Sequence, residues 1–341
     1  MEGRQLSDVG VDHGRELGIS LMGVSKAVLG EPLIAKAMIE AGIQTIADSR
    51  IENIERMKEA GIIANFVLLR TPLSRAQAIV ESADISLNTE METLNELSTH
   101  AQKISKIHKV IIMVELGDLR EGVLPCDLPQ FIKKALCFSH LEIVGIGCNL
   151  ACYGGIEPDN CNMRKLSELC RSAENDFQLS LNYVSGGNSA NYQWYQSADD
   201  IGRINNLRLG EAILLGCETV ARTPIAGLYT QAFQLVAEVV ESKIKPSIPI
   251  GKRSQDAFGN MSAIQDRGYC RRAIIALGRQ DVSISGLEAN KRMSILGASS
   301  DHLIVESYNN LQVGDEVRFN LSYSGLLSAM TSPFIKKQFL I

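Results

Sequence analysis

The sequence predicts an α/β protein: a TIM (β/α)8 barrel followed by a C-terminal all-β domain. Three observations predict this fold. A strand-then-helix alternation repeats about eight times, strand patterns without helices follow it, and the 341 residues are 45% hydrophobic. A chain of this size can bury a large core and hold two domains, one of them a barrel of about 250 residues. We expect the barrel in residues 1–228 and the all-β domain in residues 229–341.

The first expected barrel strand ends on a lysine. Residues 1–18 read as the end of a helix that stops at Gly18, and no strand precedes it. The apolar run Ile19–Ser25 is the first strand, and Lys26 follows it directly. The turn Gly30-Glu31-Pro32 then leads into a helix.

Short apolar runs alternate with amphipathic segments along the rest of the expected barrel. Its strands are expected at Gln44–Asp48, Asn65–Arg70, Asp84–Asn88, Lys109–Glu115, Ile143–Asn149, Leu181–Ser185 and Asn206–Leu209. Its helices are expected at Leu33–Ala41, Glu52–Ala60, Glu90–Ala101, Leu128–Leu136 and Met163–Asn175. In a TIM barrel the chemistry gathers at the C-terminal strand ends. We expect these polar side chains to converge there: Lys26, Asp48, Arg70, Asn88, Arg120, Asn149, Asn188 and Arg208.

The pattern changes after Thr223-Pro224, where alternating strands follow one another without helices between them. These strands are expected at Phe233–Ile244, Arg271–Leu277, Ser294–Ser307 and Glu316–Ser322. The turn Val313-Gly314-Asp315-Glu316 is typical of a small barrel or sandwich. About 110 residues are an ordinary size for such a domain.

Composition narrows the class of partner. The net charge is −5 and no long basic run occurs, which argues against a nucleic-acid partner. We see neither a leader nor an apolar stretch of membrane-spanning length, and therefore expect a cytoplasmic protein with no membrane partner and a small-molecule substrate. The eight cysteines form no C-x-x-C pair, and Cys148, Cys152 and Cys161 have no metal-site spacing, so we expect no metal.

Lys26 is the candidate around which the site is built. Burial at the end of a strand disfavours its ammonium form, and an amine with a lowered pKa is a nucleophile toward aldehydes such as pyridoxal phosphate. The alternative is a lysine whose ammonium reaches solvent from the strand end.

A series of motifs decides between these readings because it spans nearly the whole chain in order. The motifs are MGVSKAVLGEP, ADSRIENIERMKEAGI, ADISLN, MVELGDLREG, VGIGCNLACYGG, SGGNSA, NNLRLGEAILLG, DAFGN, ILGASSDH and YSGLLSAMTSP. The sequence thereby resembles the alanine racemase family of fold-type III pyridoxal-phosphate enzymes, and most closely its ornithine racemase branch. The resemblance implies a racemase that interconverts L- and D-amino acids, with ornithine or another basic amino acid as the expected substrate.

The resemblance also assigns residues to the cofactor. Lys26 matches the lysine that binds pyridoxal 5'-phosphate covalently, and Arg208 matches the arginine that hydrogen-bonds the pyridine nitrogen. An arginine does not give up its proton, so that nitrogen stays unprotonated. The remaining matches are positions that contact the phosphate or the ring in the family: Asn149, Asn188, Ser189, Gly210, Glu211 and Tyr323. Asn149 stands where the family has a histidine that stacks on the ring. Gly186-Gly187, before Asn188, would on its own more often be a plain turn.

The substrate side is less complete. Arg120 matches the arginine near the substrate carboxylate, with a weakly paired surface arginine as the alternative. The family's second base is a tyrosine from the partner's β-domain, and here Arg279 stands in its place. The best substitutes are Asp301 and His302, with Ser300 beside the substrate, although His302 is equally readable as structural. Tyr269 and Cys270 are weaker candidates. A site completed by the partner's domain implies a homodimer with composite active sites.

Three further departures from the family's pattern concern the identity of the substrate and the completeness of the β-domain. Gly30 stands where the family has a phosphate-binding tyrosine, and Asn149 replaces a histidine, which together argue against alanine as substrate. The family's first strand, which joins the β-domain, is expected to be missing, leaving an unpaired edge. A basic substrate needs an acidic residue for its distal ammonium, and the candidates are Asp48, Glu52, Glu211 and Asp256.

Two other functions remain as alternatives. A non-catalytic pyridoxal-phosphate carrier is built from the barrel alone, and the second domain argues against it. A fold-type III decarboxylase has an acidic residue opposite the pyridine nitrogen and a cysteine in the β-domain loop. Here Arg208 occupies the first position and the loop Gly297–Asp301 has no cysteine.

Overall fold

The computed structural model of the protein describes residues 18–255, 258–259 and 265–340. The chain forms two compact units, one reaching to Thr230 and the other covering Gln231–Leu340. The expected helix over residues 1–18 and the expected ligand Asp256 lie, apart from Gly18, outside the described residues.

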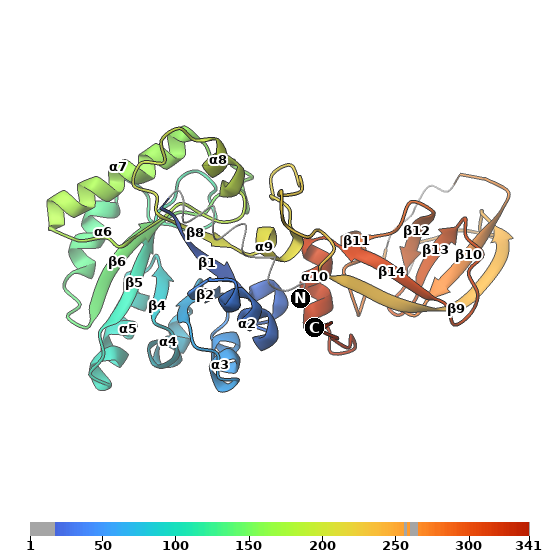
Figure 1. Ribbon diagram of the computed structural model, residues 1–341, viewed down its shortest axis with the longest axis horizontal. Coiled ribbons are helices and arrows are strands. Elements are labelled where there is room, and N and C mark those ends of the chain that lie inside the picture. The colour runs from blue at the N-terminus through green and yellow to red at the C-terminus, as the bar shows by residue number, and fades with distance from the viewer. Residues whose placement is uncertain (1–17, 256–257, 260–264, 341) are drawn as a thin grey trace. The chain divides into compact units, whose positions relative to one another are not determined.

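The first unit is a closed barrel of eight parallel strands in sequence order, with helices around its outside (Figure 1). The TIM barrel prediction is therefore confirmed. The strands are β1 (Ser20–Val24), β2 (Thr45–Asp48), β3 (Asn65–Leu68), β4 (Ile85–Asn88), β5 (His108–Met113), β6 (Leu141–Gly147), β7 (Tyr183–Ser185) and β8 (Asn206–Leu209). The helices are η2 (Lys26–Val28), α2 (Pro32–Glu40), α3 (Ile51–Glu59), η3 (Leu73–Arg75), α4 (Ala76–Ser82), α5 (Met91–Lys103), α6 (Leu128–Ala135), α7 (Asn160–Phe177), α8 (Asn191–Ser197) and α9 (Glu211–Leu215).

Hydrophobic side chains on alternate strand positions fill the barrel interior. Met22 and Val24 of β1, Val67 of β3 and Ile111 of β5 belong to one buried cluster. On the outside, α5 buries Leu94, Leu97 and Ala101, spaced three and four residues apart as an amphipathic helix requires. The short helices α4, α8 and α9 were not predicted, because segments of five to seven residues show too little periodicity.

Pairing of the first and last strands closes the barrel and fixes the site. Met22 of β1 lies opposite Arg208 of β8, and Val24 lies opposite Ala47 of β2. All eight strands run in the same direction, so the residues that follow them lie at one end of the barrel. Lys26 and Asp48 are thereby neighbours at that end.

The second unit is a six-stranded antiparallel sheet in the order β11-β14-β9-β10-β13-β12. Its elements are β9 (Gln234–Pro246), β10 (Tyr269–Ile275), η4 (Ile284–Gly286), β11 (Leu287–Glu288), β12 (Met293–Ala298), β13 (Leu303–Ser307), β14 (Glu316–Leu321) and α10 (Tyr323–Thr331). Its core includes Val239, Ile275, Leu303 and Phe319, all fully or almost fully buried.

Two details of this unit differ from the expectation. The single run expected at Ser294–Ser307 is a hairpin, β12 and β13, because the polar segment between Ala298 and Leu303 turns the chain. The expectation of strands alone is also wrong at α10, which begins at Tyr323 and buries Leu326 and Ala329. Its sequence is rich in Leu, Ala and Met, which are good helix formers.

Candidate active site

Lys26 lies directly after β1, as the first residue of the short helix η2. Its side chain is half-buried. Desolvation is the largest cause that lowers the pKa of its ammonium, and the nearby guanidinium groups of Arg120 and Arg208 lower it further. The Cys152 thiol and the Asp48 carboxylate act in the opposite direction. A lysine with a lowered pKa carries a larger neutral, nucleophilic fraction at neutral pH than a fully hydrated one.

The turn after Lys26 has no room for a side chain at position 30. Gly30 has a φ of 59°, and a Cβ there would lie 2.7 Å from the Cβ of Asn53 and 2.9 Å from its carbonyl oxygen. Asn53 of α3 therefore fills the space beside the turn. Any residue other than glycine would displace either the η2 turn or the start of α3.

Asp48 connects three elements at the end of β2. It is fully buried, and its carboxylate accepts hydrogen bonds from the Ser25 hydroxyl (2.7 Å), the Arg50 N–H (2.9 Å) and the Asn53 amide (2.9 Å). Burial raises the pKa of Asp48, while these hydrogen bonds lower it. Asp48 thereby links the segment before Lys26 to the start of α3.

Arg208 extends from β8 into the barrel and is almost fully buried. Its guanidinium donates to the Ser185 hydroxyl, to the Cys148 carbonyl at 2.7 Å and to the Asn149 side-chain oxygen at 3.5 Å. Burial lowers the pKa of Arg208 from its usual value. A guanidinium held by three neutral acceptors keeps its charge available for a ligand, since none of these acceptors neutralises it.

The two asparagines predicted from the sequence are in contact. The Asn188 amide donates to the Asn149 side-chain oxygen at 3.1 Å and to the Leu150 carbonyl at 2.8 Å. Asn149 is 8% exposed, and its own amide nitrogen has no hydrogen-bond partner among the residues that the structure describes. A buried donor without a partner is costly unless a ligand or water satisfies it.

Ser189 connects β7 to the turn after β8. Its hydroxyl accepts hydrogen bonds from the N–H groups of Gly210 (3.3 Å) and Ala212 (3.1 Å). The Glu211 side chain forms an ion pair with Arg222, and burial is the main cause that raises its pKa. The two N–H groups thereby orient the Ser189 hydroxyl, which keeps its own hydrogen as a donor for an anion such as a phosphate.

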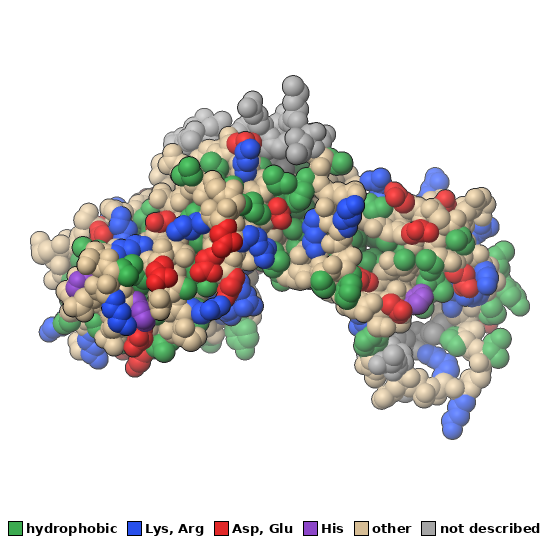
Figure 2. Space-filling model, turned by 90° about the horizontal axis from the view of Figure 1, so that it is seen from below, with side chains coloured by type: hydrophobic (Ala, Val, Ile, Leu, Met, Phe, Trp, Pro, Cys, Tyr) green, Lys and Arg blue, Asp and Glu red, His purple; other side chains and the backbone are tan. Residues whose placement is uncertain are grey.

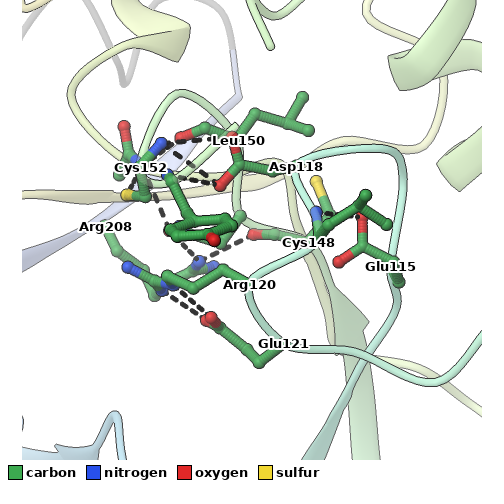
Figure 3. Close-up of polar contacts among 12 residues, drawn as sticks. Glu115, Asp118, Arg120, Glu121, Cys148, Leu150, Cys152 and Arg208 are labelled. Atoms are coloured by element: carbon green, nitrogen blue, oxygen red, sulfur yellow. Dashed lines mark hydrogen bonds and ion pairs between the residues drawn. The ribbon is translucent and has the colours of Figure 1, made fainter. Parts of the chain in front are cut away.

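Two loops at this end of the barrel are joined by Asp118 (Figure 3). Asp118 is fully buried, and its carboxylate accepts hydrogen bonds from the N–H groups of Cys152, Tyr153 and Ile156, the shortest at 2.9 Å. This role of Asp118 was not predicted from the sequence. Its position between a glycine and a leucine after a buried strand was the available signal.

Arg120 lies in the first of these loops and forms a two-point ion pair with Glu121 (Figure 3). The expected weak pairing of Arg120 with a neighbouring carboxylate is thus present. Arg120 is also close enough to Lys26 and Arg208 to lower the pKa of both groups. The pair belongs to the same cluster of charges as Lys26 and is not an isolated surface contact.

The expected convergence of polar strand ends is only partial. Asn88 turns back on its own strand and donates to the Ser86 carbonyl and hydroxyl, so the prediction for Asn88 is wrong. Arg70 is exposed, and no contact of its side chain with the Lys26 cluster is seen among the described residues. Glu52 forms an exposed ion pair with Arg75. The group that does assemble consists of Lys26, Asp48, Arg120, Asn149, Asn188, Ser189, Arg208, Gly210 and Glu211.

The predicted second bases lie in the second unit, in the turn between β12 and β13. The Asp301 carboxylate contacts the His302 Nδ1 at 2.8 Å and accepts from the Ser299 and Ser300 hydroxyls. The hydrogen bond from His302 is the main cause that lowers the pKa of Asp301. All three predicted residues, Ser300, Asp301 and His302, are exposed.

A second loop supports this turn. Gly278 contacts it so closely that a Cβ would lie 2.2 Å from the Ser300 carbonyl oxygen. The Arg279 N–H donates to the Ser299 carbonyl at 3.0 Å, and the Arg279 guanidinium lies over the Phe258 ring, 4.1 Å from its centre. Tyr323 is half-buried at the first position of α10.

Acidic and basic side chains are intermixed on the face of the molecule in Figure 2. Within the part of the chain that the structure describes, no helix has both the length and the apolar character needed to cross a membrane. Among the same residues, no group of three or more His, Cys, Asp or Glu side chains is arranged to hold a metal ion.

Comparisons with known proteins agree with this geometry. A family model described as the N-terminal domain of alanine racemase matches residues 13–217. An ornithine racemase from Acetoanaerobium sticklandii is 41% identical over 323 residues, covering 93% of this chain and 91% of that protein. A lysine racemase from Thermotoga maritima is 38% identical over 331 residues, covering 96% of this chain and 93% of that protein.

Solved structures show the same fold. An alanine racemase from Streptomyces lavendulae aligns with a TM-score of 0.75 at 16% identity, covering 96% of this chain and 92% of that chain. A D-threonine aldolase from Filomicrobium marinum aligns with a TM-score of 0.73 at 15% identity, covering 96% of this chain and 85% of that chain. At these identities the likeness concerns the fold alone, which combines a barrel with a second, β-rich unit.

Proposed function

This chain belongs to the alanine racemase family, and from that premise we propose that it is a pyridoxal-phosphate-dependent racemase of basic amino acids. One observation carries the proposal: an amine with a lowered pKa, Lys26, lies at the end of the barrel beside the buried guanidinium of Arg208. The relatives that match over both units, an ornithine racemase and a lysine racemase, support the substrate class.

The residues of the barrel fit the cofactor. Lys26 supplies the amine for its aldehyde, and Arg208 a permanent donor for its pyridine nitrogen. The unpartnered amide nitrogen of Asn149 is a buried donor that a bound ring or phosphate would satisfy. The Ser189 hydroxyl accepts from the N–H groups of Gly210 and Ala212 and can donate its own hydrogen to the phosphate. When bound, pyridoxal phosphate withdraws electrons from the amino acid and thereby acidifies its α-proton.

Racemisation needs a proton to leave one face of the α-carbon and another to arrive on the opposite face. Lys26, with its lowered pKa, is suited to hold the proton on one face. Arg120 is suited to orient the substrate carboxylate through a two-point contact. On the opposite face the partner subunit's Asp301 or His302 holds the proton, so the proposed enzyme is a homodimer with composite sites.

Chiral chromatography tests this function. Purified protein loaded with pyridoxal phosphate is incubated separately with L-ornithine, L-lysine and L-alanine. We expect D-ornithine or D-lysine to accumulate until the L- and D-forms are present in equal amounts, and L-alanine to be converted much more slowly. The Lys26→Ala variant should form no D-product. Cofactor binding without any D-product would contradict the racemase proposal and favour a carrier.

A further inference from the structure

The ion pair between Arg120 and Glu121 occupies an unusual position for a salt bridge between sequence neighbours. Both side chains are only about one-third exposed, 38% for Arg120 and 32% for Glu121. The Arg120 Nε and Nη2 atoms each donate to a different oxygen of Glu121. The pair thus uses the two-point geometry with which an arginine would otherwise bind a substrate carboxylate.

The loop that carries this pair is fixed at both ends. The Val123 N–H donates to the Met113 carbonyl at 2.8 Å, and the Glu115 N–H donates to the Val123 carbonyl at 3.0 Å, so the loop closes on the end of β5. Within the loop, Glu115 accepts from the N–H groups of Gly117 and Leu119. Arg120 and Glu121 therefore project from a braced segment, and their side chains can exchange partners without movement of the backbone.

Cations dominate the surroundings of the pair. Arg120 and Arg208 both lower the pKa of Lys26, and the Glu121 carboxylate opposes the lowering of the Arg208 pKa. Glu121 is thus close enough to the centre of the site to act on Arg208. A ligand carrying an extra ammonium would be repelled by three cations unless a carboxylate received it.

The other carboxylates near these cations are already engaged. Asp48 is fully buried and accepts three hydrogen bonds, and Asp118 is fully buried under the loop that it anchors. Glu211 is paired with Arg222 and has only 14% of its side chain exposed. Glu121 alone among these four is paired with a residue that a substrate carboxylate would compete for.

We infer that Glu121 determines specificity for basic amino acids by an exchange of ion pairs. The inference rests on the proposed function. The α-carboxylate of the substrate takes the Arg120 guanidinium, and the distal ammonium of the same substrate takes the Glu121 carboxylate that Arg120 releases. The substrate brings one carboxylate and one distal ammonium, and each forms an ion pair with one residue of the former pair. Neither Arg120 nor Glu121 is then left without a counter-ion.

The exchange also works against neutral substrates. L-norvaline has the carbon chain of L-ornithine without its distal amine, so its carboxylate would have to compete with Glu121 for Arg120. Binding would then leave Glu121 without a counter-ion in a partly desolvated place, which is costly. A carboxylate that starts out paired with the carboxylate-binding arginine therefore selects for a second ammonium.

Glu121→Gln tests the inference on the pyridoxal-phosphate-loaded protein. We expect kcat/KM for L-ornithine and L-lysine to fall about 10- to 100-fold, the range of a lost charged hydrogen bond. For L-norvaline we expect kcat/KM within about threefold of wild type or higher. The matched control is Glu174→Gln, which removes the acid of another partly buried Arg–Glu pair, Arg203–Glu174, and should leave both substrates unaffected.

Calorimetric binding of L-ornithine and L-norvaline separates this inference from the proposed function, because it needs no turnover. A wild-type preference for ornithine that disappears in Glu121→Gln supports the inference even if no D-product forms. An equal loss for both ligands would show that Glu121 only holds Arg120, and an unchanged preference would assign the ammonium to another group. Either result would overturn the inference, whereas racemisation by wild type would still support the proposed function.

Discussion

Lys26 shows how a single residue acquires chemistry from its position. A lysine loses hydration at the end of a closed barrel, and two arginines nearby make its charged form still less favourable. The sequence predicted this environment from the apolar run before Lys26. The convergence of Arg120 and Arg208 with Lys26 was predicted from their places at expected strand ends. Cys152 was not predicted as a neighbour, because it lies in a loop 126 residues further along the chain that has no periodic pattern.

Removing the Lys26 charge should stabilise the cofactor-free protein. The folded-state pKa lies below the usual 10.5, so the unfolded state binds the proton more tightly and the penalty is present at neutral pH. We expect Lys26→Met to raise the free energy of unfolding at pH 7 by about 0.5–1 kcal/mol, a gain that shrinks as pH rises toward 10.5. Thermal denaturation at pH 7 and near pH 10 measures this difference in stability. Lys36→Met, whose side chain is 63% exposed, is the control and should show no comparable gain.

His108 gives the barrel a defined acid sensitivity. It is fully buried at the start of β5, with its Nε2 2.8 Å from the Ser86 hydroxyl, and burial is the main cause that lowers its pKa to about 3. The unfolded state therefore binds more protons between pH 6.5 and 3, so stability is lost as pH falls through this window.

Substitution of His108 separates this contribution from general acid denaturation. His108→Gln keeps a partner for Ser86 but cannot take up a proton. We expect the variant to be about 1–2 kcal/mol less stable at pH 7, to match wild type at about pH 5 to 6, and to be more stable than wild type at pH 4. Urea unfolding at several pH values measures the difference. A constant difference across this range would contradict the account.

At the scale of elements, the loops after β5 and β6 set the geometry of the site. The prediction of strand positions succeeded because buried strands are apolar, but the loops carry no periodicity. Asn88 illustrates the limit: its place at a strand end was predicted, yet its side chain bonds back to Ser86. Asp118 illustrates the converse, since a buried carboxylate in a glycine-containing loop has no sequence pattern that reveals its partners 34 to 38 residues away.

Gly122 tests the importance of the loop that carries Arg120. Its φ is 143°, and a Cβ there would lie 2.3 Å from the Glu115 nitrogen, so Gly122→Ala must displace the loop. We expect kcat/KM to fall about 100-fold, the cost of a small misplacement of a binding group. Gly61→Ala is the control, because Gly61 has a φ of 79° and open space around it. It should lose about 1–2 kcal/mol of stability without loss of activity. Equal activity of the two variants would argue against the role of the loop.

At the scale of the whole molecule, the barrel holds Lys26 and the residues proposed to bind the cofactor, whereas the second unit holds the predicted proton carriers Asp301 and His302. The two-unit architecture was predictable from the change of pattern near residue 224. The β12–β13 hairpin was not, because the polar turn interrupts an otherwise continuous alternating run. In the proposed homodimer, the copy that completes each site is set by the assembly, which no sequence pattern encodes.

Mixing two inactive variants tests the composite site. Lys26→Ala lacks the amine and His302→Asn lacks one proton carrier, so each homodimer should be inactive or strongly impaired. When the two are unfolded and refolded together, half of the dimers are mixed, and each mixed dimer regains one intact site if the partner completes it. We expect about a quarter of wild-type racemase activity. If each chain completes its own site, mixing restores nothing. If His302→Asn alone remains active, Asp301→Asn is the variant to mix.

The central claim is that the Lys26 amine holds pyridoxal phosphate, and reduction with borohydride followed by peptide mass spectrometry tests it most directly. The account predicts loss of the visible absorbance band and a pyridoxyl-phosphate mass on the peptide that contains Lys26, with neither in Lys26→Ala. A modification on any other lysine, or no modification of a protein saturated with cofactor, would contradict it.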